Sequence, residues 1–144
     1  MGQALFTASK LAQDMFAEAN SIMGFDIAQT MFTGTPEELA KTSVTQPAIY
    51  IHSVILAHVM GIQKEAAMVA GHSLGEFSAL AAVGALSFAD GLRLVKARAE
   101  AMQAACDAQP STMAAVIGLE DAVVEEICAA IDGVVVPANY NSPG

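Results

Sequence analysis

The fold of this chain is decided by the stretch Ala66-Ala67-Met68-Val69-Ala70-Gly71-His72-Ser73-Leu74-Gly75. Residues 66–70 form a short apolar run between polar residues and a glycine, which is typical of a central strand buried on both faces. Small and apolar residues follow from Leu74 to Val83 and predict a helix that packs close to the sheet. A buried strand that leads directly into a helix indicates an α/β fold.

The turn between this strand and this helix has the Gly-x-Ser-x-Gly pattern of a nucleophile elbow, with Ser73 at its centre. Because the serine of an elbow sits in a strained turn, we expect Gly71 and Gly75 to be required as small residues. The helix start favours negative charge, and the backbone N–H of Leu74 is placed to stabilise an oxyanion. A Gly-Ser turn without chemistry is the alternative, but the strand–helix junction favours catalysis.

A serine nucleophile needs a base, and the chain holds three histidines, His52, His58 and His72. His72 is adjacent to Ser73, so we expect it to shape the elbow rather than to transfer a proton. The other two fall on a helix predicted from Thr45 to about Met60, one as a packing residue and one near the surface. We therefore expect that the base lies outside this chain or that the chain is inert.

Arg98 lies on a helix predicted from Phe88 to about Ala105, among small and apolar residues. A guanidinium in such surroundings is unusual unless it is paired. Two interpretations remain open at this point: a bidentate clamp for a carboxylate, or a solvated helix arginine. Composition alone favours the solvated arginine.

Length and composition limit the classes of function. The chain has 144 residues, of which 54% are hydrophobic and 15% charged, so it can bury the core of about one domain. Its net charge of −9 makes nucleic acid an unlikely partner. Cys106 and Cys128 show no metal-ligand spacing, which indicates two reduced thiols and no metal.

The charge pattern predicts a cytoplasmic protein without a membrane segment. Charged residues interrupt the first 30 residues, so no secretory signal is expected there. The most apolar stretch, residues 66–89, contains His72, Glu76 and three glycines. A strand followed by a buried helix explains it better than a membrane span.

The rest of the chain predicts further helices and a second subdomain. One helix is expected over residues 4–23 with Gly24 at its end, and a capping box at Thr35–Glu38 opens another. After a break near residue 110, a β-α-β unit is predicted from the strands and helix at Met113–Ile117, Asp121–Ile131 and Val134–Pro137. We expect residues 1–109 and residues 110–144 to form separate subdomains.

Four motifs resemble those of the malonyl-CoA:acyl carrier protein transacylases. The decapeptide Gly71–Leu80 is similar to the signature of that family, and Thr45–Ala48 is similar to its Thr-Gln-Pro-Ala segment. Leu94–Arg98 resembles its arginine-bearing helix, and Asn139–Gly144 resembles its Asn-x-Asn-Ser-Pro-Gly segment. The four motifs occur in the order that the family has.

The resemblance implies an α/β-hydrolase-like large subdomain with an inserted ferredoxin-like small subdomain. It implies transfer of a malonyl group from malonyl-CoA to the phosphopantetheine thiol of acyl carrier protein, in fatty acid biosynthesis. The transfer proceeds through an acyl-serine and needs no cofactor, since malonyl-CoA is a substrate. The partners implied are malonyl-CoA and acyl carrier protein, with no nucleic acid and no membrane.

By matching position, the resemblance makes Ser73 the acylated nucleophile, the Leu74 amide an oxyanion donor, and Arg98 the group that binds the malonyl carboxylate. This reverses the interpretation of Arg98 that composition favours. Capping and loop architecture explain the supporting residues equally well. The residues implied to line the pocket or shape the elbow are Gln46, His72, Gly75, Asn139 and Asn141.

The resemblance covers only about half of a typical family member. The segment of the family that supplies another oxyanion donor precedes Met1, and its catalytic histidine lies beyond Gly144. We therefore expect this chain alone to be inactive. The alternatives left open are an acyltransferase domain of a polyketide or fatty-acid synthase, a serine esterase or thioesterase, and an inert fragment with an exposed apolar sheet edge.

Overall fold

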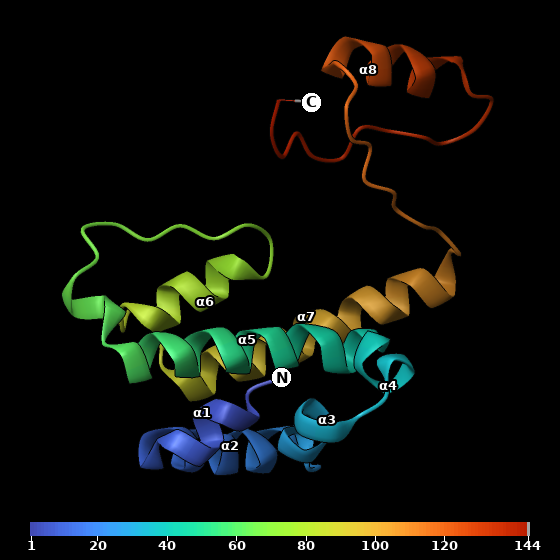
Figure 1. The fold of residues 1–144 in the computed structure, drawn as a ribbon. Helices are drawn as coiled ribbons and strands as arrows, with labels where there is room; N and C mark the ends of the chain where they lie inside the picture. The colour runs from blue at the N-terminus through green and yellow to red at the C-terminus, as the bar shows by residue number, and fades with distance from the viewer. Residues whose placement is uncertain (144) are drawn as a thin grey trace. The chain divides into compact units, whose positions relative to one another are not determined.

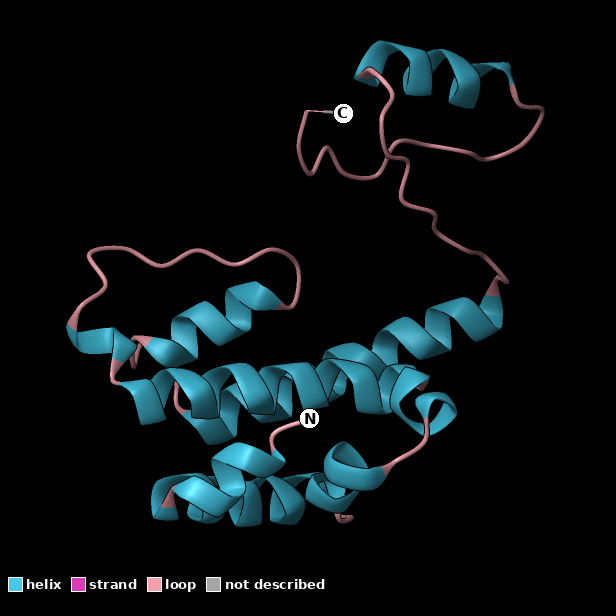
Figure 2. Ribbon diagram, viewed as in Figure 1, coloured by secondary structure: helices cyan, strands magenta, loops and turns pink. Residues whose placement is uncertain are grey.

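The computed structural model describes residues 1–143 of the chain. The chain divides into two compact units, Met1–Gln109 and Pro110–Gly144. All regular secondary structure within the described residues is helical, as Figure 2 shows. Of the helices within residues 1–143, none is long and apolar enough to cross a membrane.

The first unit is a layered bundle of helices (Figure 1). Its longest helices, α5 (Thr42–Met60) and α7 (Phe88–Ala108), pack side by side, and α6 (Gly75–Ala82) lies against both. On the opposite side, α2 (Lys10–Met23) packs on the same pair. The shorter helices are α1 (Gln3–Ala8), α3 (Ile27–Thr33), α4 (Pro36–Ala40) and the 3₁₀ turn Ile62–Lys64. The largest buried side chains come from these layers: Phe16, Ile27, Met31, Tyr50, Ile51, Val54, Ile55, Leu92 and Val95.

The helix ends in the first unit agree with the predicted caps, except that one predicted helix is divided into two. The single helix predicted over residues 4–23 is wrong, because Ser9 adopts an extended conformation and separates α1 from α2. The Ser9 side chain accepts a hydrogen bond from the Ala12 N–H at 3.3 Å and thereby caps α2. Two other predictions are confirmed: Gly24 ends α2 with φ of 82°, and Thr35 with Glu38 forms a capping box.

Helix α5 begins three residues earlier than the sequence predicts, at Thr42 instead of Thr45. Pro47 therefore lies inside the helix rather than at its first turn. A proline at this position removes the N–H that would bond the carbonyl of Ser43, four residues earlier. The packing of α5 against α7 outweighs this loss, since Pro47 is itself buried.

The crossing of α5 and α7 depends on the pair Tyr50 and Gly91. The Tyr50 hydroxyl donates to the carbonyl of Phe88 at 3.1 Å, and its ring stacks on the Phe88 ring with centroids 5.8 Å apart. A Cβ atom on Gly91 would lie 2.1 Å from the Tyr50 hydroxyl oxygen. Glycine at position 91 is thus required for the close approach of the two helices.

Replacing Tyr50 with phenylalanine is expected to alter stability mainly at alkaline pH. Burial raises the pKa of the Tyr50 phenol, and the charges of Asp90 and Glu18 raise it further. With a folded pKa above the unfolded value of about 10, the neutral phenol stabilises the fold below pH ~10 and this contribution is lost as pH rises. We expect Tyr50→Phe to lose about 1 kcal/mol at neutral pH and to show a shallower alkaline decline.

The measurement is the thermal midpoint from pH 7 to pH 12. Tyr140→Phe is the comparison, because Tyr50 and Tyr140 are the two tyrosines of the chain, and the pKa of the exposed Tyr140 is raised chiefly by a hydrogen bond to Glu125 rather than by burial. If Tyr50→Phe declined as steeply as the unsubstituted chain above pH ~10, burial of this phenol would not be the cause.

The second unit contains one helix within residues 110–143, α8 (Asp121–Ala130), between extended segments. The strands predicted over residues 113–117 and 134–137 are not formed, and neither is the strand predicted over residues 66–70 of the first unit. A strand needs a hydrogen-bonded neighbour, and the described residues supply none beside these segments.

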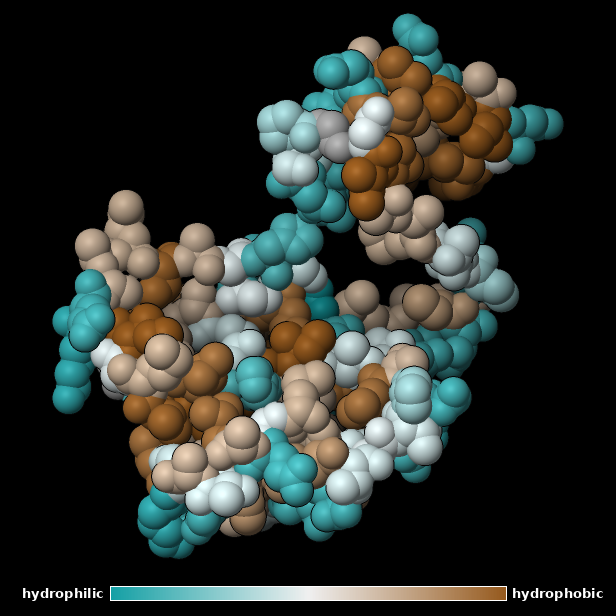
Figure 3. Space-filling model, viewed as in Figure 1, coloured by the Kyte–Doolittle hydropathy of each residue, from teal (hydrophilic) through white to brown (hydrophobic). Residues whose placement is uncertain are grey.

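Apolar side chains that a sheet would bury are therefore exposed. Met68 is 90% exposed in the first unit, and Ile117 and Val134 are 86% and 92% exposed in the second. Figure 3 shows hydrophobic residues gathered on the surface of the second unit.

In the second unit, the Tyr140 hydroxyl donates a hydrogen bond to Glu125 at 2.6 Å. This hydrogen bond raises the pKa of Tyr140.

Candidate active site

Ser73 occupies a strained turn directly before α6. Its φ of 55° makes it the one non-glycine residue with positive φ among the described residues. The turn is closed by a hydrogen bond from the Gly75 N–H to the His72 carbonyl, at 2.8 Å. The Ser73 side chain is exposed at the start of the helix. Non-glycine residues in this region are strained and cluster at functional sites, so the geometry agrees with an elbow.

The two glycines that flank Ser73 have different roles. A Cβ atom on Gly71 would lie 1.9 Å from the carbonyl carbon and oxygen of Gly75 and 2.4 Å from the Glu76 nitrogen. A Cβ atom on Gly75 would meet nothing within 4 Å. The expectation that both glycines must be small is therefore wrong for Gly75 within the described residues. The backbone passes closest to itself at Gly71, and there a side chain has no room.

The backbone N–H of Leu74 is free at this turn. It donates no hydrogen bond to any of the described residues, whereas the next three N–H groups bond to the carbonyls of His72, Ser73 and Leu74. Leu74 precedes the first residue of α6, where the partial positive charge of the helix favours an anion. The Leu74 side chain is buried and anchors this end of the helix.

Arg98 reaches Ser73 from the neighbouring helix α7. One terminal nitrogen of its guanidinium donates to Ser73 Oγ at 2.8 Å, and the other donates to Gln46 Oε1. Arg98 is half-buried, so the solvated arginine that composition favours is not observed.

The Arg98 guanidinium has no acidic partner in residues 1–143. The ion pairs formed there are Lys10–Asp14 and Arg93–Asp90. A half-buried cation is usually paired, and here the partners are a neutral hydroxyl and a neutral amide. The guanidinium is therefore suited to bind a carboxylate from outside the chain.

Gln46 joins α5 to α7 beside this guanidinium. Its amide oxygen accepts from Arg98, and its amide nitrogen contacts the Met102 sulfur at 3.3 Å. Met102 lies outside the motifs from which the site was predicted. Its position four residues after Arg98 was the available signal, because residues with this spacing share one face of a helix.

The structure does not place a base beside Ser73 within the described residues. His58 Nδ1 lies 2.9 Å from the Val54 carbonyl, one turn earlier on α5. His52 is half-buried on the same helix, and His72 is exposed in the turn itself. None of the three forms a hydrogen bond with Ser73.

The remaining predicted residues, Asn139 and Asn141, are exposed in the second unit. Gly144, the last residue of their motif, lies outside the described residues.

Among residues 1–143, no group of three or more His, Cys, Asp or Glu side chains is placed to hold a metal ion.

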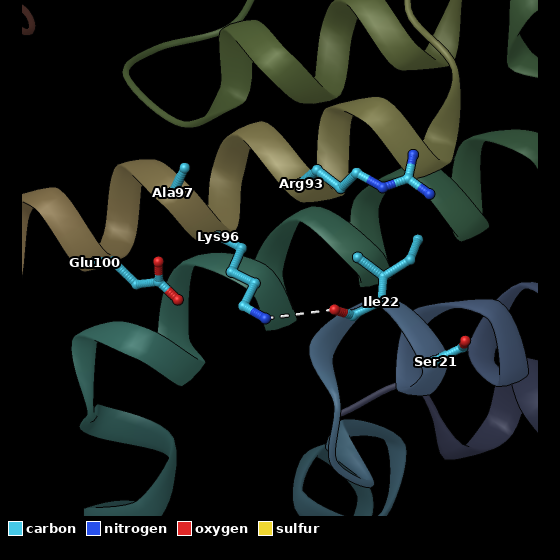
Figure 4. A pocket seen from close by; sticks show the side chains of 6 residues that line it. All are labelled: Ser21, Ile22, Arg93, Lys96, Ala97 and Glu100. Carbon is cyan, nitrogen blue, oxygen red and sulfur yellow. Dashed lines mark hydrogen bonds between the residues drawn. The ribbon is translucent and has the colours of Figure 1, made fainter.

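A hollow of about 470 Å³ lies elsewhere on the first unit, between α2 and α7 (Figure 4). Lys96 extends from α7 toward the end of α2 and donates to the carbonyls of Ile22 and Met23 at 3.4 and 3.3 Å. A cation at this end of a helix stabilises the helix dipole. The hollow contains none of the residues around Ser73, and its lysine already has partners.

The known proteins that resemble this chain belong to one family. Residues 1–144 match the family described as acyl transferase domain. The malonyl CoA-acyl carrier protein transacylase of Escherichia coli K12 is 46% identical over 138 residues, which are 93% of this chain and 45% of that protein. The chain spans about half the length of the curated relatives that it matches.

Solved structures match over the same range. The crystal structure of MCAT from Streptococcus pneumoniae has a TM-score of 0.85 and 38% identity, and covers 99% of this chain and 48% of its own. A complex of PlMCAT with the type II polyketide carrier protein AntF has a TM-score of 0.80 and 36% identity. The match covers 100% of this chain and 48% of the chain in that structure. Such structures have an α/β fold, the class that the sequence predicts.

Proposed function

Because this chain belongs to the acyl transferase family, we propose that it forms the N-terminal part of an enzyme that transfers a malonyl group. The donor is malonyl-CoA, and the acceptor is the phosphopantetheine thiol of an acyl carrier protein in fatty acid biosynthesis. One observation carries the proposal: the half-buried guanidinium of Arg98, which has no acidic partner among residues 1–143, lies 2.8 Å from the exposed hydroxyl of Ser73.

The proposed reaction has two steps. Ser73 Oγ attacks the thioester carbonyl of malonyl-CoA, a base outside the described residues takes its proton, and the CoA thiolate leaves. The thiol of the carrier protein then attacks the acyl-serine and releases Ser73. The Leu74 N–H donates to the oxyanion in both tetrahedral intermediates.

The position of Arg98 accounts for selection of a malonyl group. The carboxylate of malonyl is separated from its thioester carbonyl by one carbon, so both ends reach adjacent groups of the protein. When the carboxylate binds the guanidinium, it replaces the Ser73 hydroxyl as the partner of one terminal nitrogen. The hydroxyl is then released for attack. An acetyl group has no carboxylate and does not gain this charge-assisted contact.

The two units fit an incomplete enzyme of this kind. The proposal assigns Met1–Gln109 to an α/β-hydrolase-like large subdomain and residues 110–144 to the first β-α-β part of a ferredoxin-like small subdomain. Segments 66–70, 113–117 and 134–137 become strands once neighbouring strands are present. Asn139 and Asn141 then line the pocket. The enzyme is cytoplasmic and works without a cofactor or metal.

Replacing Arg98 with alanine tests the proposal. In the complete domain that contains this chain, we expect malonyl transfer to fall about 10- to 100-fold more than acetyl transfer, because a charge-assisted contact of about 1.5–3 kcal/mol is lost. The measurement is kcat/KM with malonyl-CoA and with acetyl-CoA. Arg93→Ala is the control, since Arg93 lies on the same helix but is exposed and paired with Asp90. Equal losses for both substrates would remove the proposed role.

A second candidate acceptor is a polyketide carrier protein. It is favoured by the match to a malonyl-transacylase solved with a type II polyketide carrier. Initial rates of malonyl transfer to a fatty-acid carrier and to a polyketide carrier, measured side by side, would decide between them.

A further inference from the structure

We propose that Met102 is a positioning residue for this site, and that it acts by fixing the orientation of the Gln46 side-chain amide. The inference rests on the proposed function, in which Arg98 binds the substrate carboxylate. It concerns a residue outside the four motifs of the sequence analysis.

Four side chains form a continuous chain of contacts from Met102 to the nucleophile. The Met102 sulfur accepts from Gln46 Nε2 at 3.3 Å, Gln46 Oε1 accepts from Arg98, and Arg98 donates to Ser73 Oγ at 2.8 Å. Arg98 and Met102 are separated by one turn of α7, so Gln46 on α5 contacts both at once.

The chemistry of the two end groups allows only one orientation of the amide. A guanidinium donates and cannot accept, so it must face the amide oxygen of Gln46. A thioether has no hydrogen to donate, so it must face the amide nitrogen. Rotating the amide by half a turn would place its NH₂ group against the guanidinium and its oxygen against the sulfur, and both contacts would be lost.

This orientation matters because Gln46 holds one of the two terminal nitrogens of Arg98. With that nitrogen held, the other is directed at Ser73 Oγ, where the carboxylate is proposed to bind. A leucine at position 102 would fill similar space but could not accept from Gln46. The contact with Arg98 alone would then hold the amide, so the Gln46 side chain and the Arg98 nitrogen that it binds would both be less firmly fixed.

The test uses the complete domain that contains this chain, with three single substitutions, Met102→Leu, Met102→Gln and Met60→Leu. The first readout, without ligand, is the NMR signal and the water-exchange rate of the Gln46 side-chain amide. The second is the affinity for malonate compared with acetamide, which has no carboxylate. Met60→Leu is the matched control, because Met60 is 64% exposed at the end of α5 and takes part in none of the hydrogen bonds that join the four side chains.

We expect Met102→Leu to shift the Gln46 signal, to speed its exchange, and to weaken malonate binding about threefold, the size of a weak neutral hydrogen bond. The affinity for acetamide should stay unchanged. Met102→Gln, whose amide oxygen is an acceptor, should restore both readouts at least in part.

A Met102→Leu chain with an unchanged Gln46 signal and unchanged malonate affinity would overturn the inference. A wild-type protein that binds malonate no better than acetamide would instead contradict the proposed function. In that case the ligand-free amide signal still decides whether Met102 orients Gln46, so the two failures are distinguishable.

Discussion

Alanine in place of Ser73 is expected to abolish malonyl transfer by the complete domain, with a loss on the order of 10⁶-fold in kcat. In the first step of the proposed mechanism, the Ser73 hydroxyl oxygen is the atom that forms a bond to the malonyl group. Arg98 and Leu74 would still bind the substrate, so the KM for malonyl-CoA should change much less than kcat. The measurement combines steady-state rates with mass spectrometry of the protein after incubation with malonyl-CoA.

Ser78→Ala is the matched control for this substitution. Ser78 lies on the same helix, α6, and its hydroxyl oxygen is buried without a hydrogen-bond partner in the described residues. Its removal leaves no group unsatisfied, so the variant should acylate as the wild type does. A malonyl adduct that persisted on the Ser73→Ala protein would place the nucleophile elsewhere.

Gly71→Ala is expected to disrupt the turn that presents Ser73. The new methyl group would lie 1.9 Å from the backbone of Gly75, and backbone atoms cannot move aside as a flexible side chain can. We expect a loss of about 3 kcal/mol in stability. Displacement of Ser73 should lower acylation about 100-fold or more.

Gly75→Ala provides the comparison, because it introduces the same methyl group on the other side of the same serine. The methyl would meet nothing within 4 Å, and alanine favours a helix start more than glycine does. The thermal midpoint should stay constant or rise, and any loss of acylation should be far smaller than for Gly71→Ala. Equal damage from both variants would show that the close approach at Gly71 does not hold the turn. Thermal unfolding and acylation rates measure the two effects separately.

Local rules predicted the helices well where the deciding contacts are close in sequence. The Thr35 capping box and the Gly24 end of α2 each depend on residues within one turn. The break at Ser9 was missed because the apolar repeat continues across it, while the side chain of Ser9 favours a cap. Strands were harder, since residues 66–70 have the composition of a strand but form none in the structure, where no neighbouring strand lies beside them among the described residues.

The candidate site was predicted in part. The Ser73 turn can be read from adjacent residues, because glycine spacing and helix pattern carry the signal. The contact between Arg98 and Ser73 joins residues 25 positions apart, and the contact between Gln46 and Arg98 joins residues 52 apart. Such contacts depend on how α5, α6 and α7 pack, which periodicity does not specify. Composition alone therefore favoured a solvated Arg98, which is not observed. The proposed role of Arg98 in binding a carboxylate came from the family resemblance.

The backbone angle at Ser73 also restricts which amino acids natural variation could place there. A φ of 55° is tolerated by a side chain with one heavy atom on its Cβ at modest strain, but it is a marked outlier for a β-branched side chain. Threonine carries an equivalent hydroxyl and would still be disfavoured, whereas cysteine fits the same backbone. An acyl-thioester pathway through cysteine is thus a chemical alternative that this turn leaves open to evolution.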